Sequence, residues 1–503
     1  MKKILIANRG EIAVRVIRAC REMGISPVAI YSECDRAALH VRLADEAHAV
    51  GPNAPRDSYL RIDRIVDAAK KAGADGVHPG YGFLAENEAF AQAVRDAGLT
   101  FIGPSPEAIA LMGSKTAARA AARKAGVPLV PGGDDPIAPD ATRDQIQASG
   151  DRIGYPLLVK AVSGGGGKGM RTVRSAGDLF GAVTAARSEA GTAFGDPAVY
   201  LERRLARPRH IEVQLLGDLH GTVVPFVERE CSIQRRHQKV VEETPSPVVT
   251  PELRRRITSA AAAVAKSVGY TNAGTIEFLL DEDGRFYFLE MNTRLQVEHP
   301  ITEAVTGLDL VRWQIAVARG DRFDVDPARV LEPNGHAIEC RIYAEDPDNN
   351  FLPSPGHIVD LRAPAGPGIR DDSGVEAGND VPIYYDPLIS KLIAWAEDRP
   401  AAIDRMRRAL GEYVVSGIRT TLPFFSWLLS QREFLDGAFH TAYLDELLAS
   451  RNGRPFLEVP PAHEDVAVIA AALRAVLSPT AANAAPDSSG RWKVQARSEG
   501  LRD

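Results

Sequence analysis

The chain has 503 residues, of which 45% are apolar and 25% are charged, and this composition is typical of globular proteins with two or three domains. Its formal net charge of −6 excludes a general affinity for nucleic acid or for an anionic membrane surface. An anionic ligand must therefore be bound by local basic clusters.

The compartment is predicted from the cysteines and the N-terminus. The four cysteines stand far apart and form no CxxC pair, which fits a reducing cytosol. The start MKKILIANRGEIAV has a superficial likeness to a signal peptide, but Arg9 and Glu11 interrupt its apolar run. No stretch approaches the ~18 to 20 apolar residues needed to span a bilayer. We expect a cytoplasmic protein with no membrane or nucleic-acid partner.

Residues 1–113 alternate predicted strands and helices, which indicates a doubly wound parallel sheet. Only Gly10 stands in the first strand-to-helix turn, so the fingerprint of a nicotinamide site is absent. The loop His78–Phe83 leaves the carboxyl end of a strand, where such sheets bind ligands. A glycine-rich structural turn explains this loop equally well.

Helical patterns at residues 106–112 and 115–125 lead to a smaller unit that begins with the strand Tyr155–Val162. The glycine-rich loop Ser163–Met170 follows it. This is not a Walker loop, because glycine follows Lys168 and a strand follows the loop. Its N–H groups could cover phosphates, or the loop could be a flexible hairpin. Lys160 favours the first interpretation, because a lysine in an apolar strand needs an anionic partner.

A third unit, rich in antiparallel strands, contains the basic stretch SIQRRHQK. If this stretch is extended, Arg235, His237 and Lys239 share one face and form an anion-binding edge. A solvated basic strand is an equal alternative.

Next comes a predicted hairpin between Thr275–Leu280 and Arg285–Leu289. An even loop centred on Glu282 and Asp283 pairs Glu277 with Phe288. The second strand is a continuous apolar run, which predicts burial on both faces.

In this hairpin Glu290 lies diagonally beside Glu277, and Asn292 follows on the same face. Two carboxylates in a buried sheet need a positive partner, and Mg²⁺ or Mn²⁺ suits oxygen ligands. An amphipathic strand with a solvated face is the alternative, but the apolar run before it disfavours that interpretation. Three more polar residues, a cation, an amide and an acid, follow Asn292 at every second position: Arg294, Gln296 and Glu298.

The apolar strand 336–347 contains Arg341, and further strands and a helix near 401–411 complete the unit by about residue 450. In the tail we expect a helix over 466–477 and poor order in the last ~25 residues. A glycine lid with lysines, a cation held by carboxylates and an anion site together indicate an ATP-dependent ligase or kinase.

Motifs throughout the chain carry a family resemblance: NRGEIAVR, HPGYGFLAEN, GSK, SGGGGKGM, PRHIEVQ, ERECSIQRRHQK, EMNTRLQVEH and HAIECRIYAEDP. From residue 2 to about 450 the chain resembles the biotin carboxylase component of the acyl-CoA carboxylases (acetyl- and propionyl-CoA carboxylase alpha type), in the ATP-grasp superfamily. The resemblance implies an α/β and α+β protein, with an ATP-grasp fold preceded by a Rossmann-like doubly wound parallel-sheet domain. The domains implied are residues 1–113, a helical linker 114–131, a lid 132–203, a C-terminal domain 204–450 and a tail 451–503.

The family reaction joins bicarbonate to ATP, giving carboxyphosphate, which then carboxylates biotin on a carrier protein. The resemblance assigns the metal, Mg²⁺ or Mn²⁺, to Glu277, Glu290 and Asn292. It assigns the nucleotide to Lys115, Lys160, Gly166, Gly167, Glu202, His210, Gln234 and His237. Bicarbonate is assigned to Lys239, Arg294, Gln296, Val297 and Glu298, with Glu298 as the base. Biotin is assigned to Arg341 and Tyr81, and the implied catalytic residues are Lys239, Arg294, Glu298 and Arg341.

Two departures from the family pattern affect these expectations. Lys168 stands where the family can have arginine, a change that a phosphate contact tolerates. The chain has no biotin-accepting Met-Lys-Met, because Met406 is its last methionine. Biotin is therefore expected on another polypeptide, or on a C-terminal region beyond this sequence.

The expected partners are a biotin carboxyl carrier protein, carboxyltransferase subunits and a second copy of the chain. The alternatives are another ATP-grasp carboxylate ligase and a catalytically silent ATP-binding regulatory subunit. The acyl-CoA that is finally carboxylated is not encoded here, because the carboxyltransferase selects it.

Overall fold

The computed structural model describes residues 1–133, 136–162, 170–457 and 461–477. Its contacts divide the chain into the units Met1–Arg454 and Pro455–Asp503. The finer domain boundaries stay predictions. Within the described ranges, none of the helices combines the length and the hydropathy needed to cross a bilayer.

The first unit begins with a five-stranded parallel sheet in the order β3-β2-β1-β4-β5. Its strands are β1 (Lys3–Ile6), β2 (Ser26–Ser32), β3 (Glu46–Gly51), β4 (Gly76–His78) and β5 (Thr100–Phe101). The helices between them are α1 (Gly10–Glu22), α2 (Leu39–Leu43), α3 (Ile62–Lys71) and α4 (Glu88–Asp96). The Rossmann-like doubly wound sheet is confirmed. The sequence did not reveal β3, because EAHAVG has no continuous apolar run.

Helices α5 (Pro106–Gly113) and α6 (Lys115–Lys124) lead to a smaller layer with its own core of Leu157, Val159, Leu179 and Val183. A three-stranded antiparallel sheet, ordered β7-β6-β8, packs there against two helices. These elements are α7 (Arg143–Ile153), β6 (Leu157–Ala161), β7 (Met170–Val173), α8 (Ala176–Phe194) and β8 (Val199–Arg203).

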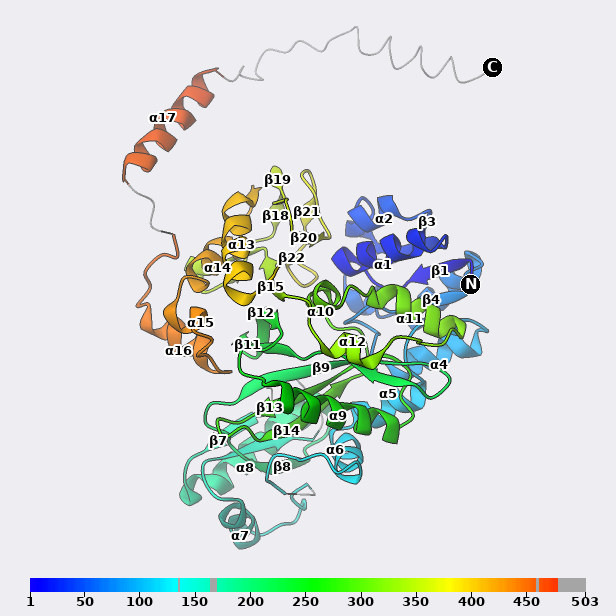
Figure 1. Cartoon of the computed structure of the whole chain (residues 1–503), viewed down its shortest axis with the longest axis vertical. Coiled ribbons are helices and arrows are strands. Elements are labelled where there is room, and N and C mark those ends of the chain that lie inside the picture. The colour runs from blue at the N-terminus through cyan, green and yellow to red at the C-terminus, as the bar shows by residue number, and fades with distance from the viewer. Residues whose placement is uncertain (134–135, 163–169, 458–460, 478–503) are drawn as a thin grey trace. The chain divides into compact units, whose positions relative to one another are not determined.

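A nine-stranded sheet holds the rest of the unit together, in the order β14-β13-β9-β11-β12-β15-β22-β20 with β10 beside β9 (Figure 1). Its strands are β9 (Arg209–Gly217), β10 (Val223–Pro225), β11 (Arg229–Arg235), β12 (Gln238–Thr244), β13 (Asn272–Leu280), β14 (Phe286–Asn292), β15 (His336–Tyr343), β20 (Ile369–Ser373) and β22 (Leu388–Ala396). The helices are α9 (Pro251–Ser267), α10 (His299–Thr306), α11 (Leu310–Arg319), α12 (Pro327–Leu331) and α13 (Arg399–Glu412).

Helix α9 shows how sequence sets this packing. Thr250 caps its first turn by accepting from the Leu253 N–H, and Ile257, Ala261 and Val264 recur at helical spacing and are fully buried. The helix packs on β9, as Figure 1 shows, and on β10. Helix α11 shares a different core with α1, and this core joins the N-terminal sheet to the large sheet.

Short elements complete the first unit. They are η1 (Glu33–Asp35), η2 (Pro55–Asp57), β16 (Glu345–Asp346), η3 (Pro347–Asn349), β17 (Leu352–Pro353), β18 (Gly356–His357), β19 (Asp360–Arg362), β21 (Asp380–Val381), β23 (Val414–Ser416), α14 (Leu422–Leu428), α15 (Arg432–Leu435) and α16 (Tyr443–Ser450). The second unit contains α17 (Pro461–Leu477), which confirms the helix predicted over 466–477. The predicted poor order of the last ~25 residues falls on residues 478–503, which lie outside the described residues.

The hairpin of β13 and β14 exists, but its predicted register is wrong by one residue. Phe278, not Glu277, pairs with Phe288. Gly284 adopts a left-handed φ of 76°, which makes the loop odd in length. A β-bulge next to Glu277 then brings that residue directly opposite Glu290, so the two carboxylates lie side by side.

The large sheet is also held by Glu243 on β12, which bonds His336 at 2.7 Å and Arg399 at 2.7 Å. Burial by itself raises the pKa of Glu243, but these two partners lower it to about 2. A carboxyl whose pKa is lower when folded stabilises the protein above its unfolded pKa. That contribution disappears as the pH falls from about 4.5 towards 2.

We expect Glu243→Gln to lower the free energy of unfolding by about 3 kcal/mol near neutral pH, the energy equivalent of this pKa shift. Urea unfolding measures it, and the difference from wild type should shrink at about pH 3.5. Glu412→Gln, which breaks an exposed ion pair with Arg408, is the control and should cost less than ~1 kcal/mol. Equal losses from both variants would contradict the prediction.

Candidate active site

The turn between β11 and β12 replaces the extended basic edge that the sequence predicted. Arg236 and His237 have left-handed φ values of 50° and 65° and form a two-residue hairpin turn. Arg235, His237 and Lys239 therefore do not share one face, and that prediction is wrong. The sequence did not predict this turn, because the stretch SIQRRHQK contains no glycine, asparagine or aspartate, the usual residues of such turns.

After the turn, the Lys239 side chain points toward three glutamate carboxylates. Its Nζ lies 2.5 Å from a carboxylate oxygen of Glu212, 2.9 Å from Glu277 and 2.8 Å from Glu298. Burial opposes the charge of Lys239, but the three carboxylates raise its pKa well above the usual range. Lys239 is therefore a fixed cation at the centre of the large sheet.

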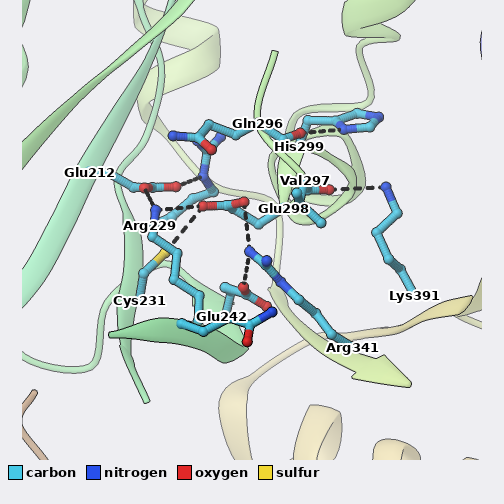
Figure 2. A network of polar contacts seen from close by, with 12 residues as sticks. Glu212, Arg229, Cys231, Glu242, Gln296, Val297, Glu298, His299, Arg341 and Lys391 are labelled. Carbon is cyan, nitrogen blue, oxygen red and sulfur yellow. Dashed lines mark hydrogen bonds and ion pairs between the residues drawn. The ribbon is translucent and has the colours of Figure 1, made fainter. Parts of the chain in front are cut away.

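Glu298 precedes α10, is fully buried and bonds Lys239, and Figure 2 shows the Arg341 guanidinium beside it. Arg341 from β15 donates to its second oxygen at 3.0 Å and also pairs with Glu242 at 2.5 Å. Burial would raise the pKa of Glu298, but Lys239 and Arg341 lower it well below the usual range. The carboxylate is therefore charged.

The two side-by-side carboxylates on β13 and β14 have different surroundings. Burial raises the pKa of Glu277, but Lys239 and His210 outweigh it and lower the pKa below its usual range. Burial and the charge of Glu277 raise the pKa of Glu290. Asn292 donates to Glu277 at 2.8 Å.

A hard divalent cation fits this set of oxygen donors, because it would neutralise the excess negative charge on Glu290. His210, Glu212 and Glu277 also have atoms within 4.8 Å of one another. The Lys239 ammonium bonds both of those carboxylates, whereas Glu290, opposite Glu277, forms no ion pair with another described residue. We therefore favour the pair Glu277 and Glu290 for a metal.

Five of the eight predicted nucleotide residues line one cleft of about 390 Å³. It is lined by Lys115, Lys160, His210, Gln234, His237, Lys239, Glu277, Glu290, Asn292, Arg294, Gln296 and Val297. Glu202 lies beside the cleft and is the anionic partner that Lys160 needs, at 2.5 Å. Gly166 and Gly167 lie outside the described residues, so their assignment stays a prediction.

A second cavity of about 440 Å³ adjoins the first. It is lined by loops after β1 and β4, where the strand order of the N-terminal sheet reverses, the usual ligand position in such sheets. Tyr81 comes from the second of these loops. The two cavities share four lining residues: Gln238, Arg294, Val297 and Arg341. A group in one cavity can therefore reach a group in the other.

The sequence missed several partners of these residues. Glu86 accepts from Arg294 Nε at 2.9 Å and from the Thr293 N–H at 3.0 Å. Arg229 bonds Glu212 at 2.5 Å in the interior (Figure 2). Glu86 stands in HPGYGFLAEN, and Glu212 alternates with His210 in PRHIEVQ. These two motifs could therefore have identified both glutamates as candidate site residues.

Comparisons with family models cover most of the chain. Residues 1–109 match "Biotin carboxylase, N-terminal domain", residues 114–325 match "Carbamoyl-phosphate synthase L chain, ATP binding domain", and residues 339–446 match "Biotin carboxylase C-terminal domain". The chain belongs to the biotin carboxylase family. Among its relatives is biotin carboxylase 1 of Bacillus subtilis, 50% identical over 88% of this chain and 98% of the relative. A pyruvate carboxylase subunit of Methanothermobacter thermautotrophicus is 52% identical over 88% of this chain and 89% of the relative.

Solved structures of biotin carboxylases have the same fold. The biotin carboxylase domain dimer of Hydrogenobacter thermophilus 2-oxoglutarate carboxylase, solved with MgADP, ADP and bicarbonate, superposes with a TM-score of 0.85. It is 47% identical and matches 91% of this chain and 99% of its own. Campylobacter jejuni biotin carboxylase, in a β-γ-ATP complex, also gives a TM-score of 0.85, at 45% identity over 88% of this chain and 98% of its own. The predicted ATP-grasp fold, preceded by a Rossmann-like domain, is confirmed.

Proposed function

We propose that this chain uses ATP and bicarbonate to carboxylate biotin on a carrier protein, through carboxyphosphate. The observation that carries the proposal is the pair of adjoining cavities. One is lined by lysines, histidines and a carboxylate pair, and the other by Tyr81 and Arg341. Arg294, Val297 and Arg341 belong to both cavities, which supports a bicarbonate-derived group between ATP and biotin.

The first cavity is proposed to hold MgATP. Glu277, Glu290 and Asn292 would hold the metal, which withdraws charge from the phosphoryl group when it is bound. The nucleotide residues are Lys115, Lys160, Gly166, Gly167, Glu202, His210, Gln234 and His237. Burial lowers the pKa of Lys115, and a phosphate beside it would favour its charged form.

Bicarbonate is proposed to bind Lys239, Arg294, Gln296 and the Val297 backbone. Glu298 takes the bicarbonate proton, and a bicarbonate oxygen attacks the γ-phosphorus while the bond to ADP breaks. In the structure, Lys239 and Arg341 hold the Glu298 carboxylate charged. An anion beside Lys239 offsets that positive charge, which makes Glu298 a stronger base.

Biotin is proposed to enter the second cavity beside Tyr81, where the Arg341 guanidinium stabilises the enolate form of its ureido ring. This sequence contains no Met-Lys-Met site, which supports a biotin that is carried outside this sequence, and the proposal is a separate carrier protein. A carboxyltransferase and a second copy of the chain are the other proposed partners. This agrees with relatives that are carboxylase subunits or dimers.

All four cysteines are unpaired, which supports a cytoplasmic location.

The experiment that tests the function is phosphate release from MgATP, with bicarbonate and a biotinylated carrier each supplied or withheld. We expect release to need bicarbonate and to rise with the carrier far above the rate with free biotin. Free biotin lacks the carrier contacts that position its ring. An equal rate of phosphate release with and without bicarbonate would contradict the proposal. An equal rate with the biotinylated carrier and with free biotin would contradict the use of biotin in trans.

Arg341→Ala should abolish biotin carboxylation while sparing much of the slow bicarbonate-dependent ATP cleavage, because Arg341 is proposed to contact the enolate, and Lys239 still holds Glu298 charged in the variant. Transfer of labelled bicarbonate to the carrier and phosphate release are measured in parallel. Arg235→Ala is a matched control, because it breaks a 2.8 Å Arg–Glu pair outside both cavities. If Arg341→Ala damages both activities equally, Arg341 acts at the phosphates instead.

A further inference from the structure

The loop before α10 carries a backbone donor at the wall between the two cavities. Val297 lines both cavities, and its N–H donates to no acceptor in the part of the chain that the structure describes. The loop then enters the N-terminus of α10, where backbone N–H groups favour an anion. The free N–H is therefore suited to an oxyanion.

The peptide that carries this N–H is held through its carbonyl. His299 Nδ1 lies 2.8 Å from Gln296 O, the oxygen of the same peptide (Figure 2). A carbonyl only accepts, so Nδ1 carries the proton and the tautomer is fixed. The next carbonyl along, Val297 O, accepts from Lys391 Nζ at 3.0 Å. Two consecutive peptides are therefore fixed by side chains.

His299 itself does not touch the cavities. It is fully buried and lines neither of them. Burial, and then the nearby charges of Lys391 and Arg15, hold its pKa well below the usual range, so the ring is neutral. A neutral ring that donates its one N–H to a backbone carbonyl is a fixed hydrogen-bond donor and does not shuttle protons.

We propose that His299 is a positioning residue for bicarbonate, acting through the peptide between Gln296 and Val297. Its bond to Gln296 O fixes the direction of the Val297 N–H and polarises it, which strengthens the bond that this N–H donates to a bicarbonate oxygen. The inference rests on the proposed function, because it needs bicarbonate at Val297. Lys391 orients the next peptide, but it also pairs with the buried Glu11 at 3.2 Å, so substituting it would disturb more than the loop.

The test compares His299→Leu, which removes the donor, with His299→Asn, whose amide nitrogen can replace Nδ1. Steady-state phosphate release gives KM for bicarbonate and for MgATP separately. We expect His299→Leu to raise KM for bicarbonate roughly 10-fold or more and KM for MgATP by less than about twofold. His299→Asn should recover most of the loss.

His40→Leu is the control for loss of a buried imidazole, because His40 is equally buried and its Nε2 lies 3.2 Å from the carbonyl of Ile30. It should lower the melting temperature without a change specific to bicarbonate. If His299→Leu does not fold, His299→Asn is compared with His299→Gln, whose amide nitrogen matches Nε2 and should not rescue.

Two results would overturn the inference: equal changes in both KM values, or equal damage by the donor-retaining and donor-lacking variants. Both are readable only if the wild type shows bicarbonate-dependent ATP cleavage. If the wild type lacks it, the proposed function itself fails.

Discussion

Glu290→Gln should lower MgATP-dependent turnover by about 100-fold or more while the fold stays intact, because the amide is isosteric but removes a charge from the proposed metal site. Glu290 faces Glu277 directly across the hairpin, so the variant leaves one carboxylate where two would hold the cation. Phosphate release at ordinary and at raised Mg²⁺ measures the effect. Raised Mg²⁺ should recover part of the activity.

The same variant separates a metal role from a structural one. Burial and Glu277 already raise the pKa of Glu290, so neutralising this side chain relieves repulsion when no metal is bound. We therefore expect the melting temperature of the metal-free variant to equal or exceed that of wild type. Near wild-type turnover at ordinary Mg²⁺ would refute the metal assignment.

Glu298→Gln should reduce bicarbonate-dependent phosphate release by ~10²- to 10⁴-fold, the range for losing a general base. The metal and nucleotide residues remain, so MgATP should still bind, as nucleotide titration by calorimetry can show. Loss of MgATP binding with a surviving bicarbonate response would mean that Glu298 has another role.

This variant also disturbs a charge cluster, and the structure indicates by how much. Lys239 keeps Glu212 and Glu277, and Arg341 keeps Glu242, so neither cation loses all of its partners. We expect a modest change in stability beside a large loss of activity. A glutamine that unfolds the protein would show that Glu298 is primarily structural.

The sequence predicted the layers because hydrophobic periodicity is a local signal. The alternation of strands and helices predicted the parallel sheet, and the two apolar runs on either side of Asp281 predicted the hairpin. The register was not predictable in the same way. It depends on Gly284 adopting a left-handed φ and on a bulge beside Glu277 that no composition rule marks.

The candidate site shows the same division between local and distant contacts. Most of the residues predicted for the metal and bicarbonate follow each other in EMNTRLQVEH, so one stretch of sequence predicted them, whereas Glu277 and Lys239 stand in earlier strands. The partners of this stretch come from far along the chain: Glu86 meets Arg294, and Arg341 meets Glu298. Such pairs form only when separate elements pack together, which periodicity does not specify.

The central claim is that a bicarbonate oxygen attacks the γ-phosphorus of ATP. The most direct test is turnover with ¹⁸O-labelled bicarbonate in unlabelled water, followed by mass spectrometry of the inorganic phosphate. The proposed chemistry predicts that each phosphate released in the presence of carrier contains one oxygen from bicarbonate. Phosphate that takes its new oxygen from water alone would contradict the claim, because ATP cleavage would then proceed without carboxyphosphate.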